Sequence, residues 1–166
     1  RAILVTAGIL GLSIGLLEMP FMAFRSLRSV SDAERAAAHF VQSALDTRAV
    51  VQPEPDHRPP LLQLTERRFA VANPDDAHVQ VFAPADGAKM RRDVDAARGA
   101  FRTADSAVAW KRLAELGVDY VWIGENEHAI CGVCVQFRHP AFFDPVFEDD
   151  VVTVVRVRKE TGSSIN

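Results

Sequence analysis

The clearest hydrophobic pattern in the chain lies in Leu113–Glu125, where a helical segment stops at a glycine and an apolar segment follows. Gly117 lacks a Cβ and can take the left-handed conformation that commonly ends a helix. The near-continuous apolar run Val118–Ile123 is typical of a strand that is covered on both faces. We expect Tyr120 and Trp122 to point to opposite faces of this strand. Helix, glycine and buried strand together predict an α/β fold.

The most apolar stretch is Ala2–Phe24, which only Glu18 interrupts with a charge. A run of this length can cross a hydrocarbon core of about 30 Å at about 1.5 Å per residue. A signal peptide would need a shorter apolar core and a small-residue cleavage site, and the segment before Arg25 offers a poor one. A buried core helix would carry more polar positions in a domain of this size. The sequence therefore predicts one transmembrane helix over residues 1–24, in contact with membrane lipid.

One side of this predicted membrane helix carries small residues at four-residue spacing. They are Ala7, Gly11 and Gly15, with Gly8 beside them. In lipid, small residues allow helix backbones to approach closely. We therefore expect this face to pack on other transmembrane helices, from the same parent chain or from other subunits.

The rest of the chain divides into a juxtamembrane amphipathic helix over residues 25–47, an α/β head domain over 48–160 and a polar tail over 161–166. The pair Ser31 and Glu34 has capping-box spacing and begins the helix. The helix is expected to end near Asp46–Thr47. Its apolar positions share one side; they are Ala33, Ala36, Ala37, Phe40, Val41, Ala44 and Leu45.

Short strands are expected in the head at Arg48–Gln52, Arg68–Ala72 and His78–Phe82, with a proline-rich surface loop at Pro53–Pro60. A helix follows from Pro84–Gly87 to about Phe101. Near the end of the chain, two β arms predict a C-terminal β-hairpin whose second arm is an outer strand of the sheet. The arms are Phe142–Glu148 and Val151–Arg158. The fold class is thus a small three-layer-like α/β domain.

Composition and motifs narrow the functional classes. The net charge is −3 and no basic face stands out, so no nucleic-acid partner is expected. The hydrophobic content of 48% is close to the average of soluble proteins but is concentrated in the first segment. The sequence contains no phosphate-binding loop, dinucleotide fingerprint, serine-hydrolase elbow or zinc-protease motif. No catalytic residue, bound metal or cofactor is therefore predicted, and the chain is not expected to be an enzyme by itself.

One cluster contains potentially reactive side chains, namely His128, Cys131, Cys134 and His139. Two thiols and two imidazoles could supply four tetrahedral zinc ligands. The Cys-Gly-Val-Cys spacing also occurs in thiol–disulfide oxidoreductases, although no such fold surrounds it here. Covalent haem attachment is excluded because Val135, and not histidine, follows the second cysteine. A local disulfide in an oxidising compartment and two inert thiols are the remaining alternatives, and we expect the pair to do no chemistry.

Several short motifs together resemble a known domain. After the apolar run and the capped helix come Thr65–Arg68, the strand segment Leu116–Gly124, and Phe142–Asp150 leading into Val152–Val157. This organisation resembles the C-terminal extracytoplasmic domain of bacterial multi-span glycosyltransferases that use lipid-linked sugars, and of related multi-span membrane proteins.

The resemblance has two departures and assigns no catalytic residue. Glu66 stands where the family often has glycine, and the segment with Cys131 and Cys134 has no counterpart. In such enzymes the catalytic acid lies in the first extracytoplasmic loops, far upstream of the C-terminal domain.

Two functions of different classes follow from these observations. The first is a non-catalytic scaffold or lid in a glycosyltransferase-like protein of the bacterial inner (cytoplasmic) membrane. The alternative is a single-span accessory subunit of a large respiratory or photosynthetic membrane complex. Arg25, Arg28 and Arg35 follow the predicted span, and the positive-inside rule would place the head in the cytoplasm. The resemblance implies an extracytoplasmic head, which we expect.

Overall fold

The computed structural model describes residues 30–56, 65–71 and 87–159 of the chain. The predicted membrane helix, its small-residue face and the predicted strand at His78–Phe82 lie outside these residues. Within the described ranges, no helix is both long enough and apolar enough to cross a bilayer. The chain divides into two compact units, Arg1–Asp32 and Ala33–Asn166, and the second contains the sheet.

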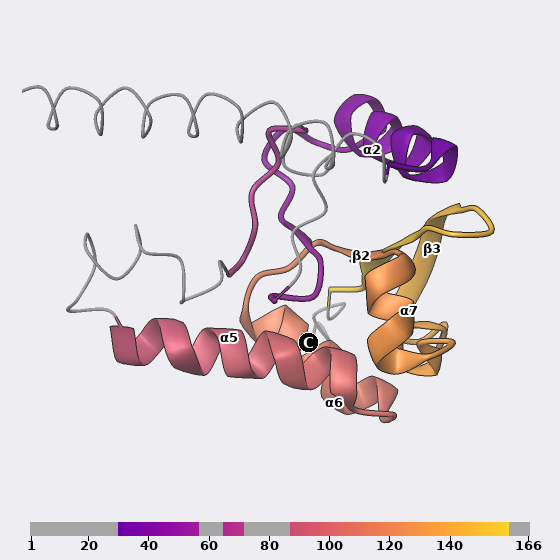
Figure 1. The fold of residues 1–166 in the computed structure, drawn as a ribbon. Helices are drawn as coiled ribbons and strands as arrows, with labels where there is room; N and C mark the ends of the chain where they lie inside the picture. The colour runs from indigo at the N-terminus through magenta and orange to yellow at the C-terminus, as the bar shows by residue number, and fades with distance from the viewer. Residues whose placement is uncertain (1–29, 57–64, 72–86, 160–166) are drawn as a thin grey trace, which may run out of the picture. The chain divides into compact units, whose positions relative to one another are not determined.

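The described residues form a small α/β domain around a four-stranded mixed sheet (Figure 1). The strand order is β1-β2-β4-β3; β1 and β2 are parallel and the other neighbours are antiparallel. The strands are β1 (Val51–Gln52), β2 (Tyr120–Ile123), β3 (Phe143–Glu148) and β4 (Thr153–Val157). The helices are α2 (Asp32–Ala44), α5 (Gly87–Arg102), α6 (Ser106–Glu115), α7 (Glu125–Cys131) and the short 3-10 helix η2 (Val135–Phe137).

The predicted C-terminal hairpin is confirmed, but its second strand is not an outer strand. Strand β3 pairs with β4, with Phe143 opposite Val157, and β4 also pairs with β2, with Trp122 opposite Val154. In the sequence, Arg156 suggests that one face of β4 is in contact with solvent, and this residue is exposed in the structure. In the structure Val154 is fully buried, so both faces of β4 are covered over most of its length.

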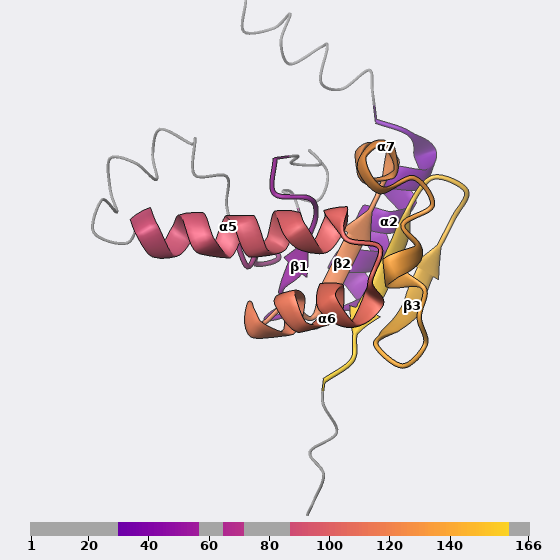
Figure 2. The same cartoon turned by 90° about the horizontal axis from the view of Figure 1, so that it is seen from below.

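Two apolar cores lie on the two faces of the sheet, and the ribbon shows α2 on one side of it and α5 and α6 on the other (Figures 1 and 2). One lies against α5, α6 and η2; its members include Phe101, Leu113, Val121, Ile123, Phe137, Phe143 and Val155. The other lies against α2; its members include Val41, Val51, Trp122, Val152 and Val154. The sheet is therefore the middle of three layers.

The two aromatic residues of β2 lie on the same face. Trp122 is buried in the core beside α2, and Tyr120 packs against that core, whereas Val121 and Ile123 belong to the other core. The expectation that Tyr120 and Trp122 face opposite ways is wrong, because side chains two residues apart on a strand share a face. The expectation that both faces of β2 are covered is confirmed.

The junction between α6 and β2 has the predicted glycine stop. Gly117 has a φ of 70°, and its N–H donates to the carbonyl of Ala114 at 3.0 Å. The N–H of Val118 donates to the carbonyl of Leu113 at 3.0 Å, and both side chains are buried in one core. This is the Schellman arrangement, in which two otherwise unpaired helix carbonyls are satisfied and an apolar contact closes the turn.

Helix α2 buries a narrower stripe than its sequence predicts. Ala37, Ala38 and Val41 are buried, whereas Ala36 and Ala44 are exposed. The helix ends at Ala44, before the predicted Asp46–Thr47.

An arginine from a distant segment caps the end of α2. Nη2 of Arg67 donates to the carbonyls of Gln42 and Leu45, at 2.7 and 3.1 Å. A positive donor at the C-terminus satisfies free carbonyls and opposes the helix dipole. The predicted strand at Arg68–Ala72 is reduced, among its described residues, to one parallel bridge between Arg68 and Val50.

Candidate functional site

The carboxyl ends of the parallel strands β1 and β2 bring two buried glutamates together. Open α/β sheets commonly bind their ligands at this end of parallel strands. Gln52 of β1 is in register with Val121 of β2, so Glu54 after β1 lies near Glu127 in the first turn of α7. The N–H of Glu54 donates to Oε1 of Glu127 at 3.2 Å. Both glutamates have an exposed fraction of 0%.

Glu127 holds this end of the sheet together. Its Oε2 accepts from the N–H of Gly124 at 2.9 Å, where β2 turns into α7. A carboxylate at this helix position satisfies an unpaired backbone donor and matches the positive end of the helix dipole. A Cβ at Gly124 would lie 2.9 Å from Nε1 of Trp122, so the turn also requires glycine for space.

Glu54 is buried to the same degree but is less completely bonded. Its Oε2 accepts from the N–H of Asp56 at 2.7 Å. Its Oε1 is buried and has no hydrogen-bond partner. Burial raises the pKa of Glu54 and the charge of Asp56 adds to this effect, while the N–H of Asp56 and the charges of Arg102 and Arg98 act in the opposite direction. The protonated form of Glu54 is thus favoured more than in a free glutamate.

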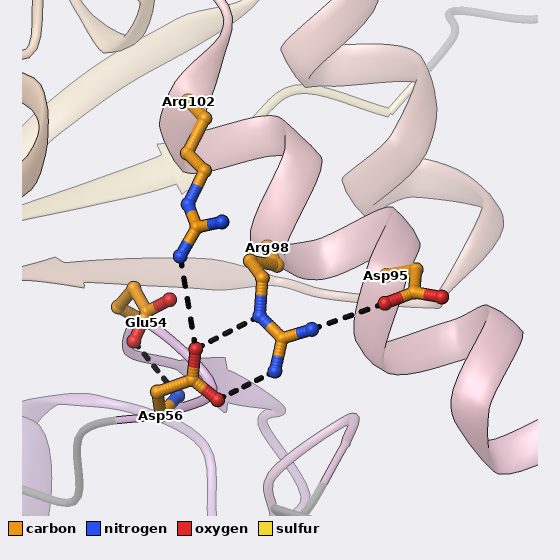
Figure 3. A network of polar contacts seen from close by, with 5 residues as sticks. All are labelled: Glu54, Asp56, Asp95, Arg98 and Arg102. Carbon is orange, nitrogen blue, oxygen red and sulfur yellow. Dashed lines mark hydrogen bonds and ion pairs between the residues drawn. The ribbon is translucent and has the colours of Figure 1, made fainter.

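A charged network borders Glu54 on the side of α5 (Figure 3). Nε and Nη2 of Arg98 donate to the two carboxylate oxygens of Asp56, at 2.8 and 2.6 Å. Asp95 accepts from Nη1 of Arg98 at 3.0 Å, and Arg102 lies 3.8 Å from Asp56. The hydrogen bond from Arg98 lowers the pKa of Asp56. Two neighbouring carboxyl groups therefore have pKa values shifted in opposite directions.

One oxygen at this end of the sheet is buried without a hydrogen bond. Oε1 of Glu54 offers one hydrogen-bonding position, as an acceptor when ionised and as a donor when protonated. Among the residues described, no three histidine, cysteine, aspartate or glutamate side chains are grouped so that they could hold a metal ion.

The predicted Cys–His cluster is only partly brought together. The structure joins Cys131 and Cys134 by a disulfide, which is one of the alternatives that the sequence leaves open. Nδ1 of His128 lies 2.8 Å from the carbonyl oxygen of Gly132 and 3.8 Å from Sγ of Cys134.

His139 is placed apart from that cluster. Its Nδ1 accepts from the N–H of Ala141 at 3.2 Å, and its ring centroid lies 5.2 Å from that of Phe142. The four side chains considered as zinc ligands therefore do not converge on one point, and the two sulfurs are bonded to each other.

Sequence reasoning missed Glu54, Glu127, Arg98 and Asp56. The proline-rich stretch Pro53–Pro60 is predicted as a surface loop, yet Pro53, Glu54 and Pro55 are buried. Their position directly after β1 is the signal that could have identified them, because this is where a parallel strand presents polar groups to a ligand. The pairing with Glu127 is not visible in the sequence, since 73 positions separate the two residues.

Two open grooves lie at the opposite end of β2, with volumes of about 610 and 670 Å³. They share Asp119, Val157, Arg158 and Lys159. Lys159 pairs with Asp119 at 3.0 Å, and Arg158 lies 4.0 Å from Asp144. These charges largely neutralise one another, so the grooves have no dominant sign of charge.

Comparison with known proteins places the fold. No protein-family model matches the sequence, and no curated protein matches it. The structure is similar to the crystal structure of the C-terminal globular domain of an oligosaccharyltransferase from Archaeoglobus fulgidus, with a TM-score of 0.50 and 14% sequence identity. The similarity covers 78% of this chain and 99% of that domain. At this identity it shows the fold alone, and at that level the expected likeness to the C-terminal domain of a sugar-transferring protein is confirmed.

Proposed function

We propose that this chain is the C-terminal part of a glycosyltransferase-like protein of the bacterial inner membrane, and that its head acts there as a non-catalytic scaffold or lid. The observation that carries the proposal is the fold similarity, which spans 99% of the archaeal oligosaccharyltransferase domain. A likeness over a whole domain supports descent of the entire head from such a module.

The disulfide supports an extracytoplasmic head. Cys131 and Cys134 are joined to each other in the structure. Disulfides persist in oxidising compartments outside the cytoplasm and are rare within it. In this proposal the segment Ala2–Phe24 anchors the head, and its face of Ala7, Gly11 and Gly15 packs on other membrane helices.

The carboxyl-end network supports a binding or positioning role and not a chemical one. Glu54 has one buried oxygen without a partner, and Arg98 is held by Asp56 and Asp95. Arg98, Asp56 and Asp95 form a fixed and partly exposed charged surface, which can orient a neighbouring segment or substrate group, while the reacting groups come from elsewhere in the protein.

Deletion of the head from the encoded protein tests the proposal. We expect removal of residues 31–159 to leave membrane insertion intact and to abolish sugar transfer from a lipid-linked donor. Trp122→Ala should reduce transfer through loss of the folded head, whereas Val108→Ala, at an exposed position, should not. Unchanged transfer after deletion would exclude a scaffold or lid role.

Two further measurements address the anchor and the side of the membrane. An intact mass of the native protein that leaves room for only one span contradicts the multi-span parent and favours the accessory-subunit alternative. A cysteine introduced at Val108 in a variant lacking the native pair should react with a membrane-impermeant maleimide in intact spheroplasts. Reaction only after lysis would place the head in the cytoplasm.

A further inference from the structure

The Cys131–Cys134 disulfide lies in a short exposed connection between α7 and η2. The sulfur-bearing residues differ in burial: Cys131 is half-buried at the end of α7, whereas Cys134 is 2% exposed. The bond closes a loop with a sequence separation of 3. Because the stabilising effect of a disulfide grows with the length of the loop it closes, a loop this short gains little. The disulfide is therefore expected to add little to the stability of the fold.

Exposed apolar side chains gather around the disulfide. In the described part of the chain, four large hydrophobic side chains are exposed, and three of them flank the two cysteines. Ile130, Val133 and Val135 are 42%, 63% and 51% exposed, and the fourth, Val108 on α6, is 38% exposed. Single exposed apolar residues are ordinary, but a group of them marks a surface that contacts another molecule. We call Ile130, Val133 and Val135 the apolar rim.

The backbone at the second cysteine is strained. Cys134 has a φ of 46°, and Gly132 has a φ of 61°. Glycine adopts such angles freely, whereas a residue with a Cβ does so at an energetic cost. Strained backbone at a non-glycine residue is commonly found where a protein performs a function. Opening the bond would allow Cys134 to leave this conformation.

A histidine N–H group lies beside the sulfur of Cys134. Nδ1 of His128 is 2.8 Å from the carbonyl oxygen of Gly132. A carbonyl oxygen can only accept, so Nδ1 must carry the hydrogen in this contact. The same nitrogen lies 3.8 Å from Sγ of Cys134. The hydrogen on Nδ1 is directed at the carbonyl of Gly132, and the ring nitrogen lies beside the sulfur that would become a thiolate if the bond were broken at Cys131.

A cavity of about 200 Å³ opens at the same place. Its lining includes His128, Val133, Cys134, Arg138 and Glu148. The cavity therefore lies on the side of Cys134, the leaving sulfur, and both apolar and charged groups line it.

We propose that Cys131–Cys134 is a thiol–disulfide exchange site that accepts two electrons from a protein dithiol docked on the apolar rim. A thiolate of the partner attacks Sγ of Cys131, and a new bond forms between these two sulfurs. The electron pair of the Cys131–Cys134 bond leaves on Sγ of Cys134 as a thiolate, next to Nδ1 of His128, and this thiolate takes a proton from water.

The second step completes the transfer. The remaining thiol of the partner loses its proton to water and attacks the partner's other sulfur, which is bonded to Cys131 in the mixed disulfide. Cys131 then leaves as a thiolate and takes a proton from water, the partner becomes a disulfide, and this chain holds two thiols. This exchange requires only the geometry around α7 and η2 and is independent of the proposed function. It departs from the expectation that the pair does no chemistry.

Trapping with single-cysteine variants tests the direction of attack. The whole 166-residue chain is purified as Cys134→Ser and as Cys131→Ser, and each is incubated with oxidised glutathione under native conditions. Intact mass spectrometry should show the mixed disulfide forming at least tenfold faster on Cys131 than on Cys134. Equal rates, or faster reaction of Cys134, would overturn the proposed direction of attack.

Matched variants test the rim and the histidine with two reductants. Reduced thioredoxin is the protein dithiol, and dithiothreitol is the small one. We expect Val133→Asp to slow reduction by thioredoxin at least tenfold and to leave reduction by dithiothreitol unchanged, whereas Val108→Asp changes neither rate. His128→Ala should slow both reactions, and His39→Ala, at an exposed position of α2, should slow neither.

Two results would contradict the proposal outright. In the first, thioredoxin reduces the native protein no faster than the protein unfolds, which identifies a purely structural disulfide. In the second, Val133→Asp and Val108→Asp behave alike with thioredoxin, which excludes docking on the rim. Circular dichroism of every variant shows that it is folded before its rate is compared.

Discussion

Glu127 and Glu54 occupy equivalent places at the carboxyl ends of two paired parallel strands, yet their surroundings differ. Both side chains have an exposed fraction of 0%. The two oxygens of Glu127 accept from the N–H groups of Gly124 and Glu54. In Glu54 one oxygen accepts from the N–H of Asp56, and the other, although buried, has no partner.

This difference shows that a buried carboxylate does not stabilise the fold merely by being buried. A buried carboxylate stabilises the fold only where its hydrogen bonds replace those it made to water. Glu127 meets that condition and joins three segments: the end of β2, the start of α7 and the chain after β1. Glu54 meets it at one oxygen only, so its burial stabilises the fold less. The effects of substitution should therefore differ sharply between the two glutamates.

The largest loss of stability is expected from a substitution in the apolar core, and the other losses are compared with it. Ile123 is 3% exposed and belongs to the core beside α5 and α6. Ile123→Ala should lower the free energy of unfolding by roughly 2–5 kcal/mol, because it removes buried methyl groups and leaves a cavity. Ile130→Ala, at a position that is 42% exposed, is the control and should change it by less than about 0.5 kcal/mol. A similar small loss at both positions would mean that β2 is not central.

Glu127→Ala should follow in size. The substitution leaves the N–H groups of Gly124 and Glu54 buried without this partner. Leaving a buried donor unpaired costs about 1–3 kcal/mol, which urea unfolding would detect as a lower midpoint with an unchanged slope. Glu125→Ala, at an exposed position in the first turn of the same helix, should lose less than about 1 kcal/mol through the helix dipole alone. Equal losses would show that the backbone hydrogen bonds of Glu127 contribute nothing.

The disulfide at the far end of α7 should contribute less than Glu127. Cys131→Ser with Cys134→Ser should fold and assemble normally and lose at most about 2 kcal/mol, because the loop is short. Thermal unfolding of the double variant, compared with the native protein under oxidising conditions, gives this value. Elemental analysis of both proteins is the control: stoichiometric zinc that is lost in the variant would contradict the disulfide and support the zinc alternative.

The sequence predicted the elements whose signals are local. Gly117 ends α6 because a residue without a Cβ can take the left-handed conformation at that point. The apolar residues of β2 favour a strand whichever strands become its neighbours. The C-terminal hairpin was predicted for the same reason. The position of β4 in the sheet was not, because strand order depends on β2, which lies about thirty residues earlier in the chain.

The candidate site could not be predicted in the same way. Glu54 follows a proline and precedes another, a pattern that predicts a solvated loop. Its backbone N–H donates to Glu127 across 73 positions, and no local pattern carries that information. The cysteine spacing draws attention to the pair that the structure joins as a disulfide. Spacing alone does not distinguish zinc ligands, inert thiols and a disulfide, because the compartment and the fold decide among them.

The ion pair next to Glu54 gives a smaller effect with a defined pH dependence. Asp56→Asn should cost about 0.2–1 kcal/mol at pH 7, since the pair with Arg98 is partly exposed to solvent. The pKa of Asp56 is lowered in the folded protein, so its contribution is present above the unfolded pKa and disappears as the pH falls through the folded pKa. Asp95→Asn, which removes the more exposed partner of Arg98, is the control and should cost less. A loss that does not shrink as the pH is lowered through the acid range would exclude the ion pair as its cause.

Glu54→Gln should have the smallest effect at pH 7, and its dependence on pH should have the opposite sign. Burial raises the pKa of Glu54 in the folded protein, so the folded state binds this proton more tightly than the unfolded state does. The favourable contribution is complete below the unfolded pKa and is lost as the pH rises through the folded pKa. Glutamine cannot ionise, so the variant should gain stability relative to the native protein as the pH rises from 4 to 8. At pH 7 its free energy of unfolding should equal or exceed the native value by less than about 1 kcal/mol. Urea unfolding of both proteins across this range measures the difference, and a variant that loses stability with rising pH would show that the ionised carboxylate of Glu54 is bonded as fully as that of Glu127.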